Sequence, residues 1–358
     1  MAVFRAIDTG LREGRAQIAF DEALIELHKA GTIPDTVRFL RFPPTALIGR
    51  HQAMSQEVKV EHCRANNIGL VRRITGGGAI YFDEGQIGWE VVLSRKRMPM
   101  PSLGDYTRAI CEAVAHGLSS AFGIDARFRP RNDIEVGGQK LCGTGGFFDG
   151  DTLFYQGTVL IDVDPARMMA CLNVPAAKLQ KRDLDKAEQR VTTLKALLGG
   201  AAPEIAAVQE AVLLGLREKL GVEIEPGAPS NAEEALAKKI HAESIGTDEF
   251  VYEIDSPRGA GISEASLTGP GGTVSAFVRL EGTGGTRRVR EVLLTGDFFV
   301  TPPRMVLDLE AALRGVAVGE VGAAVDRYFA ASRPDLLTIA PQDFRKVIEE
   351  AVAAGGMS

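Results

Sequence analysis

The stretch "VRRITGGGAIYFD", Val71 to Asp83, places two arginines, a threonine and three consecutive glycines between two apolar segments. Glycine has no Cβ, so a ligand can lie directly against the backbone N–H groups of such a segment. Arg72 and Arg73 add planar guanidinium donors that suit phosphate or carboxylate. The pattern therefore indicates a backbone strip for an anionic ligand, with a glycine-rich hairpin and two solvated arginines as the alternative. It is neither a Walker loop nor G-x-G-x-x-G.

Short β-like segments surround this stretch. "TVRFLRF", "TALIGR", "GLVRRI", "AIYFD" and "IGWEVVLS" follow one another, mostly separated by Gly, Pro or Asp. Strands without intervening helices favour a mixed or antiparallel sheet over a doubly wound parallel one. Amphipathic helices are predicted at 17–31, 105–124 and 204–220. The fold class is therefore α/β (α+β), with a large domain whose mixed or antiparallel central sheet is flanked by helices.

The composition shifts near "EIEPGAPSNAEEALAKK", which predicts a domain boundary. Pro226, Gly227 and Pro229 are typical of a linker, and Ser230 with Glu233 forms a capping box that opens a new helix. We expect a catalytic domain over 1–228 and a small α+β C-terminal domain over 235–358. The two phenylalanines of "GDFF" (296–299) are expected in the core of the small domain.

Charge and composition exclude several classes of protein. The 358 residues carry a net charge of −6, so no overall basic field favours nucleic acid. No apolar run approaches the roughly 18 residues of a membrane helix, and the N-terminus does not resemble a signal peptide. Four cysteines without C-x-x-C spacing indicate neither a zinc site nor a disulfide framework. We therefore expect a cytoplasmic protein with reduced thiols.

A second glycine-rich segment, "RPRNDIEVGGQKLCGTGG", surrounds Lys140. An Asn–Asp pair is most often a turn and a lone lysine a solvated surface group. The combination nevertheless indicates a nucleotide whose phosphates lie between two glycine segments. Lys140 would then act as a point charge at the reacting centre, and Asp133 could hold a metal or a ligand hydroxyl. Cys142 is a candidate nucleophile, although no histidine lies near it in sequence.

The order of motifs resembles the lipoate–protein ligase A family of the biotin/lipoate protein ligase superfamily. "TALIGRHQ", "LVRRITGGGAIYFDEGQ", "RNDIEVGGQKLCGTGG", "YQGTVLIDVD" and "QRVTTLKALL" carry this resemblance over roughly residues 20–200. The remaining residues resemble the C-terminal accessory domain of ligases that activate free lipoate on their own, chiefly through "LTGDFF".

The resemblance implies an ATP- and Mg²⁺-dependent reaction in two steps. Free lipoate becomes lipoyl-AMP, and the lipoyl group then moves to a lysine of an acceptor lipoyl-domain protein. A glycine cleavage H-like protein or a dehydrogenase E2 lipoyl domain is such an acceptor. The small domain is expected to rotate about the 222–235 linker between the steps.

The resemblance also implies roles for individual residues. Lys140 corresponds to the catalytic lysine that contacts the lipoate carboxyl and the phosphate, and Asp133 lies on the Mg²⁺ side of the site. The residues implied to bind the nucleotide and lipoate are Arg73, Thr75, Gly76, Gly77, Gly78, Ala79, Ile80, Tyr81, Asn132, Asp133, Gly143, Thr144 and Gly157.

Four positions depart from the family pattern. Phe82 and Gln156 replace histidines, Gln86 replaces an asparagine, and Gly145 replaces an alanine or serine. Lys140 is retained, so adenylation remains the expected chemistry. The departures bear on the acyl-chain specificity and on the acceptor.

Two other functions stay open. One is a cysteine-dependent octanoyl or lipoyl transferase that uses Cys142 and no ATP, and the other is a non-catalytic lipoate-binding protein. A biotin ligase is disfavoured because its G-R-G-x-x-G-R motif is absent. The basic residues at 178–190 are a candidate acceptor surface or, alternatively, a solvated helix face.

Overall fold

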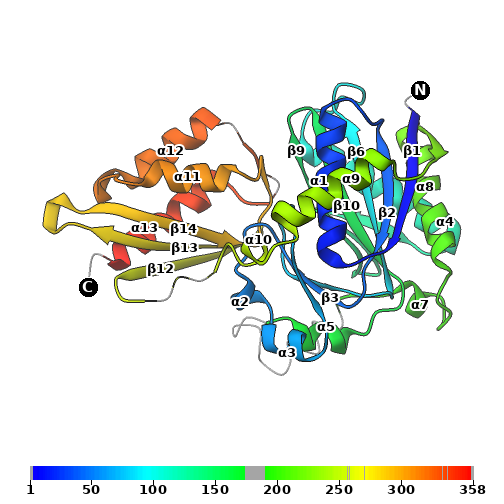
Figure 1. Cartoon of the computed structure of the whole chain (residues 1–358), viewed down its shortest axis with the longest axis horizontal. Coiled ribbons are helices and arrows are strands. Elements are labelled where there is room, and N and C mark those ends of the chain that lie inside the picture. The colour runs from blue at the N-terminus through cyan, green and yellow to red at the C-terminus, as the bar shows by residue number, and fades with distance from the viewer. Residues whose placement is uncertain are drawn as a thin grey trace.

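An eight-stranded mixed sheet forms the centre of the larger of two units (Figure 1). The computed structural model describes residues 3–173, 190–255, 257, 259–269, 271–332, 334–336 and 338–355. The strand order is β11 (Glu223–Pro226), β1 (Val3–Leu11), β2 (Thr36–Arg41), β6 (Gln86–Ser94), β10 (Thr152–Leu160), β9 (Gln139–Asp149), β8 (Asp133–Val136) and β7 (Ala126–Arg129). β1 is parallel to β11 and β2, and the other pairs are antiparallel. The predicted mixed sheet is confirmed.

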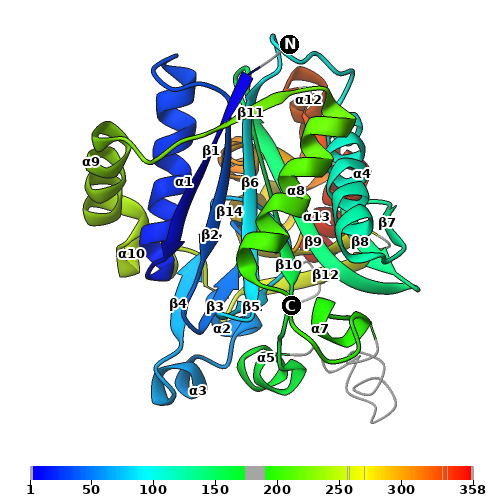
Figure 2. The same cartoon turned by 90° about the vertical axis from the view of Figure 1, so that its right-hand side faces the viewer.

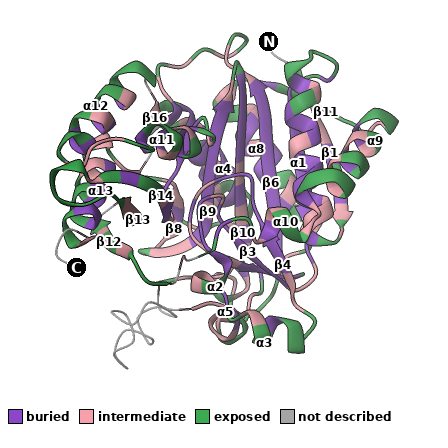
Figure 3. Cartoon of the chain, turned by 60° about the vertical axis from the view of Figure 1, so that its left-hand side comes forward, coloured by how far each residue is buried: buried purple, intermediate pink, exposed green. Residues whose placement is uncertain are grey.

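Helices cover both faces of this sheet. Figure 2 shows α4 (Leu103–Phe122) and α8 (Ile205–Leu220) on one side, with α1 (Gly14–Lys29) and α9 (Asn231–Ile240) on the other. The central strand β6 is buried along nearly its whole length (Figure 3). Val91 packs into the core on the α4 and α8 side, whereas its neighbour Val92 packs on the α1 side. A strand with two covered faces needs such a continuous apolar sequence.

A smaller sheet carries the glycine stretch. Its central strand β3 (Thr45–Ile48) is parallel to β4 (Gly69–Arg72) and antiparallel to β5 (Ile80–Phe82). The glycines 76–78 therefore connect two strands that lie on opposite sides of β3. The hairpin alternative is wrong, because β4 and β5 do not pair with each other.

The C-terminal unit is a small α+β structure with its own apolar core, as predicted. Three antiparallel strands pack against helices on the left of Figure 1. These elements are β12 (Ile262–Gly269), β13 (Gly272–Glu281), β14 (Arg288–Gly296), α11 (Met305–Leu313), α12 (Val321–Ser332) and α13 (Pro341–Gly355). Two further short strands of this unit, β15 (Val300–Thr301) and β16 (Asp335–Leu336), form an antiparallel pair.

The segment between the two units is bound to the larger one. The predicted capping box of Ser230 and Glu233 is present at the start of α9, and Glu233 also pairs with Arg5 of β1. β11 pairs with β1, so the expected linker at 222–235 is partly a strand of the main sheet. α9 packs on α1, and the chain up to α10 (Asp248–Val251) stays with the large unit although 235 was the expected start of the C-terminal domain.

The remaining helices are short. They are α2 (Met54–Glu57), α3 (Val60–Ala65), α5 (Pro165–Cys171), α7 (Leu194–Leu197), the π-helix His241–Ile245 and the 3₁₀ turns Gly284–Thr286 and Val318–Glu320. Within the ranges given above, no helix is long and apolar enough to cross a membrane.

Two glycines let α4 and α8 approach each other closely. A Cβ added at Gly117 would lie 1.9 Å from the carbonyl oxygen of Ala211, and one at Gly215 would lie 1.9 Å from that of Ala113. The helices can contact through their backbones only while both positions lack a side chain.

We expect Gly117→Ala to lower the free energy of unfolding by about 1–3 kcal/mol, because its Cβ must push the two backbones apart. Gly104→Ala, in the first turn of the same helix, is the matched control, since its nearest contact would be Ser102 Oγ at 3.5 Å. Urea unfolding of both variants measures the difference. Equal stabilities would show that the helix contact is not this close.

Candidate active site

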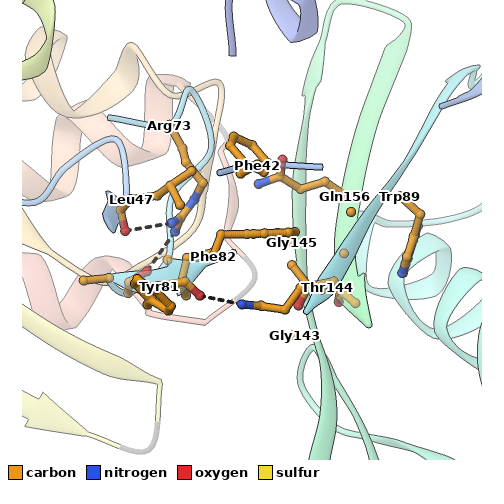
Figure 4. A pocket seen from close by; sticks show the side chains of 18 of the residues that line it. Phe42, Leu47, Arg73, Tyr81, Phe82, Trp89, Gly143, Thr144, Gly145 and Gln156 are labelled. Atoms are coloured by element: carbon orange, nitrogen blue, oxygen red, sulfur yellow. Dashed lines mark hydrogen bonds between the residues drawn. The ribbon is translucent and has the colours of Figure 1, made fainter. Parts of the chain in front are cut away.

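A cavity of about 320 Å³ lies between the glycine stretch, the inner strands β6, β10 and β9 of the main sheet and Phe299 of the C-terminal unit. Figure 4 shows Arg73 and Leu47 on one side of it, with Gly143, Thr144 and Gly145 of β9 on the other. Most residues that the sequence nominated line this cavity: Lys140, Arg73, Gly76, Gly77, Gly78, Ala79, Ile80, Tyr81, Asn132, Gly143, Thr144 and Gly157. Two nominated residues, Thr75 and Asp133, are not among its lining residues.

The backbone of Lys140 is held at the cavity by one neighbouring segment, residues 190–192. Its backbone N–H donates to Arg190 O at 2.8 Å, and its carbonyl accepts from Thr192 N at 2.9 Å. Arg190 and Thr192 thus fix the backbone of the lysine in place. Its side chain is 36% exposed, and a Cβ at Gly143 would lie 2.7 Å from Lys140 Nζ. Gly143 therefore leaves room for the ammonium group.

Asp133 is engaged by two cations. Its Oδ1 lies 2.7 Å from Lys140 Nζ, and its Oδ2 accepts from the guanidinium of Arg129. Asp133 thus orients the lysine in this structure. Mg²⁺ is commonly bound by one or two carboxylates together with phosphate oxygens, but here the single nominated carboxylate already has cationic partners. The described residues contain no group of three potential metal ligands. Metal binding at Asp133 stays a prediction, and we derive no step from it.

Arg73 braces the glycine stretch. The side chain is buried, and its guanidinium donates to Leu47 O at 3.2 Å, to Gly76 O at 3.3 Å and to Gly78 O at 2.8 Å. Burial lowers the pKa of Arg73 to about 10. We expected both arginines to offer their guanidinium donors to an anionic ligand. The donors of Arg73 are instead largely bonded to backbone carbonyls of the protein.

Arg72 connects more distant segments. Its buried guanidinium donates to carbonyl oxygens in 49–52 and 250–254 at distances of 2.6 to 3.4 Å. Burial, with a smaller contribution from the charge of Arg50, lowers the pKa of Arg72 to about 9. Neither arginine is a solvated group. Together they fix the loop, the strand end before it and the segment that leads to the C-terminal unit.

Three of the departures from the family pattern have partners inside the structure. Gln156 donates to Thr75 Oγ1 at 2.6 Å, which explains why Thr75 is buried rather than open to a ligand. Gln86 donates to Tyr81 O at 3.0 Å. The ring of Phe82 packs on that of Phe42, with their centroids 4.6 Å apart.

Asn132 and Thr144 join β9 to the loop before β8. Asn132 Nδ2 donates to Thr144 O at 2.5 Å, and Thr144 N donates back to Asn132 O at 2.9 Å. Thr144 Oγ1 also lies 2.5 Å from the hydroxyl of Tyr155. This network fixes one wall of the cavity before any ligand binds.

The apolar inner part of the cavity was not predicted from the sequence. Its lining side chains are also buried core residues, so the sequence pattern does not distinguish them from the rest of the core: Ile18, Leu40, Phe42, Leu47, Phe82 and Trp89. Asp21 and Glu90 line the same region beside the buried Arg38, to which both are bonded. Burial, together with the neighbouring charge of Glu90, raises the pKa of Asp21 well above its usual range.

All four cysteines are buried, and none of them lines this cavity. Cys142 lies in β9 beside Lys140, but burial raises the pKa of its thiol well above the usual value. "GDFF" also differs from expectation. Phe298 lies in the small core, whereas Phe299 lines the cavity. The basic segment 178–190 lies outside the described residues except for Arg190.

Comparison with known proteins identifies the family of the chain. Residues 13–217 match the family described as "Lipoyl protein ligase A/B catalytic domain". The octanoyltransferase LipM of Kyrpidia tusciae is 30% identical over 276 residues, which cover 70% of this chain and 99% of that protein.

Two solved structures have the same fold in the larger unit. A bi-partite lipoate protein ligase from Thermoplasma acidophilum, studied with its E2 lipoyl domain, aligns with a TM-score of 0.64 and 25% identity over 72% of this chain and 99% of that one. Lipoate-protein ligase A bound with ATP aligns with a TM-score of 0.61 and 25% identity over 70% and 98%.

The fold and the site thus define an enzyme class that contains both lipoate ligases and octanoyltransferases. Within it, the chain belongs to the lipoyl protein ligase A/B catalytic domain family.

We expect Arg73→Lys to lower the free energy of unfolding by about 2–3 kcal/mol, because one ammonium group cannot replace all three bonds to buried carbonyls. Arg304→Lys is the control, since Arg304 is 81% exposed and pairs only with Asp308 on the next turn. Denaturant titration gives both values. An Arg73→Lys variant as stable as the control would contradict the bracing role.

Proposed function

We propose that the protein is an ATP-dependent lipoate–protein ligase, which activates free lipoate to lipoyl-AMP and transfers the lipoyl group to a lysine of an acceptor lipoyl-domain protein. The observation that carries this proposal is the position of Lys140. Its ammonium group lies over the bare backbone of Gly143, in a cavity that also contains the glycine strip and an apolar inner part. An acyl chain can occupy the apolar part while its carboxylate meets the cation.

In the first step, a carboxylate oxygen of lipoate attacks the α-phosphorus of ATP. A new P–O bond forms, and the bond to the leaving pyrophosphate breaks. Lys140 stabilises the negative charge that develops on the phosphate oxygens, together with N–H groups of the glycine stretch other than that of Gly77, which donates to Phe298 O. In the second step, the acceptor amine attacks the acyl carbon, AMP leaves with the electrons of the C–O bond, and the amine loses a proton.

The likeness to a ligase described as bound with ATP supports the nucleotide in this proposal. The bi-partite ligase studied together with its E2 lipoyl domain supports an acceptor of the lipoyl-domain class. A glycine cleavage H-like acceptor, Mg²⁺ and a cytoplasmic location are expectations that accompany the proposal.

A cysteine-dependent octanoyltransferase is the second candidate, because the LipM relative is an octanoyltransferase. Such an enzyme needs a reactive thiol near the acyl group. Cys142, the nominated nucleophile, is buried outside the cavity lining, and burial raises its pKa. The accessible ammonium group of Lys140 favours the ligase over both this candidate and a non-catalytic lipoate-binding protein.

The direct test is lipoate-dependent exchange of pyrophosphate into ATP. We expect exchange in the wild type and a loss of at least about 100-fold in Lys140→Ala, because the variant lacks the cation at the reacting phosphate. Lys195→Ala is the matched control, since Lys195 pairs with Asp162 and lies outside the cavity lining.

The contrary result is equally clear. Wild-type protein without exchange, but with ATP-independent octanoyl transfer that is lost in Cys142→Ala, would replace the ligase by the cysteine transferase.

A further inference from the structure

The C-terminal unit contributes one side chain to the catalytic cavity. Phe298 and Phe299 follow β14, and they diverge. The ring of Phe298 lies between His51 and Phe344, with centroid distances of 5.1 Å to each, and closes the core of the small unit. Phe299 is 8% exposed and lines the cavity of the large unit.

Hydrogen bonds before and after Phe299 in the chain fix the direction of its side chain. Gly296 N donates to His51 O at 3.0 Å, and Gly77 N donates to Phe298 O at 3.2 Å. The Thr301 hydroxyl accepts from Phe148 N of β9 at 3.4 Å. The segment 296–301 is therefore attached to the large unit before and after Phe299, so the ring has a defined place.

Two glycines of the large unit make room for this ring. A Cβ at Gly145 would lie 2.1 Å from Phe299 Cε1, and one at Gly77 would lie 2.6 Å from Phe299 Cζ. Both distances are far below van der Waals contact. Gly145 is also a position where the resembling family has alanine or serine. The missing side chain at 145 and the inserted ring are thus complementary.

The ring stands between the two ends of the cavity. Gly145 lies two residues along β9 from Gly143, over which the Lys140 ammonium sits, and Gly77 belongs to the opposite wall. A chain whose carboxylate meets Lys140 and whose tail enters the apolar inner part must pass beside Phe299.

We propose that Phe299 is a specificity-determining wall of the acyl site, which limits the size of the acyl group that can bind, and that Gly145 is bare in order to receive its ring. This inference rests on the proposed function, because it assigns the cavity to a fatty or lipoic acid. Phe299 acts by contact with the acyl chain and takes no part in proton or phosphoryl transfer.

The test is direct binding of hexanoate, octanoate, decanoate and lipoate to the full chain. The signal is the fluorescence of Trp89, which is the only tryptophan and lines the cavity. In Phe299→Ala, we expect the ratio of decanoate affinity to hexanoate affinity to rise about tenfold, because the wall is gone. Phe299→Leu, which keeps an apolar side chain without the ring, should give an intermediate ratio.

Gly145→Ala provides the complementary measurement. Its Cβ collides with the ring, so we expect octanoate and lipoate affinity to fall about tenfold. The double variant Gly145→Ala/Phe299→Ala should recover most of that loss, since contacting residues give non-additive effects. Gly319→Ala is the control, because an added Cβ there has no neighbour within 4 Å.

Two results would overturn the inference. If Phe299→Ala and Phe299→Leu weaken all acids by the same factor and Phe299→Ala does not rescue Gly145→Ala, then Phe299 is only a structural contact between the units. If the wild type binds none of the four acids, the proposed function fails and takes the inference with it. If the wild type binds the acids but the ratio of decanoate to hexanoate affinity is unchanged in the variants, only the inference about Phe299 fails. The proposed function then stands.

Discussion

Buried guanidinium groups bonded to backbone carbonyls are the constraint on which the site depends. A stretch of three glycines has little conformational preference of its own. Arg73 bonds to Gly76 O and Gly78 O and thereby gives the stretch one shape, while Arg72 ties the neighbouring loop to the segment before the C-terminal unit. A guanidinium with several planar donors can satisfy many buried carbonyls at once, which a lysine cannot. The positive charges beside the glycines therefore act first on the protein itself.

Several glycines of the site leave room for neighbouring groups of the protein itself, as well as for a ligand. Gly49 and Gly76 allow backbone carbonyls to approach, Gly143 leaves room for Lys140, and Gly145 leaves room for Phe299. Gly78 differs, because a Cβ there would meet Asp297 Cβ only at 3.7 Å. Bare backbone at this site is thus the result of close packing between the two units and around the side chain of Lys140, in addition to any contact with a ligand.

The sequence predicted those features that local patterns determine. Successive β-like segments without intervening helices predicted the mixed sheet, and Ser230 with Glu233 predicted the start of α9. Long-range packing decided the rest. Nothing near Thr75 in the chain indicates its bond to Gln156, and nothing in "GDFF" separates the buried Phe298 from Phe299 in the cavity. The attachment of α9 to β1 and to the turn before α1 likewise depends on ion pairs between residues more than 200 positions apart.

If the protein is the proposed ligase, it forms an acyl-adenylate in this cavity and no covalent acyl-enzyme. Mass spectrometry of the protein after incubation with ATP and lipoate, without an acceptor, tests it most directly. We expect lipoyl-AMP that is bound non-covalently and is released when the protein is denatured. The mass of the denatured protein should be unmodified. A lipoyl adduct that stays on a cysteine after denaturation, with no lipoyl-AMP, would contradict it.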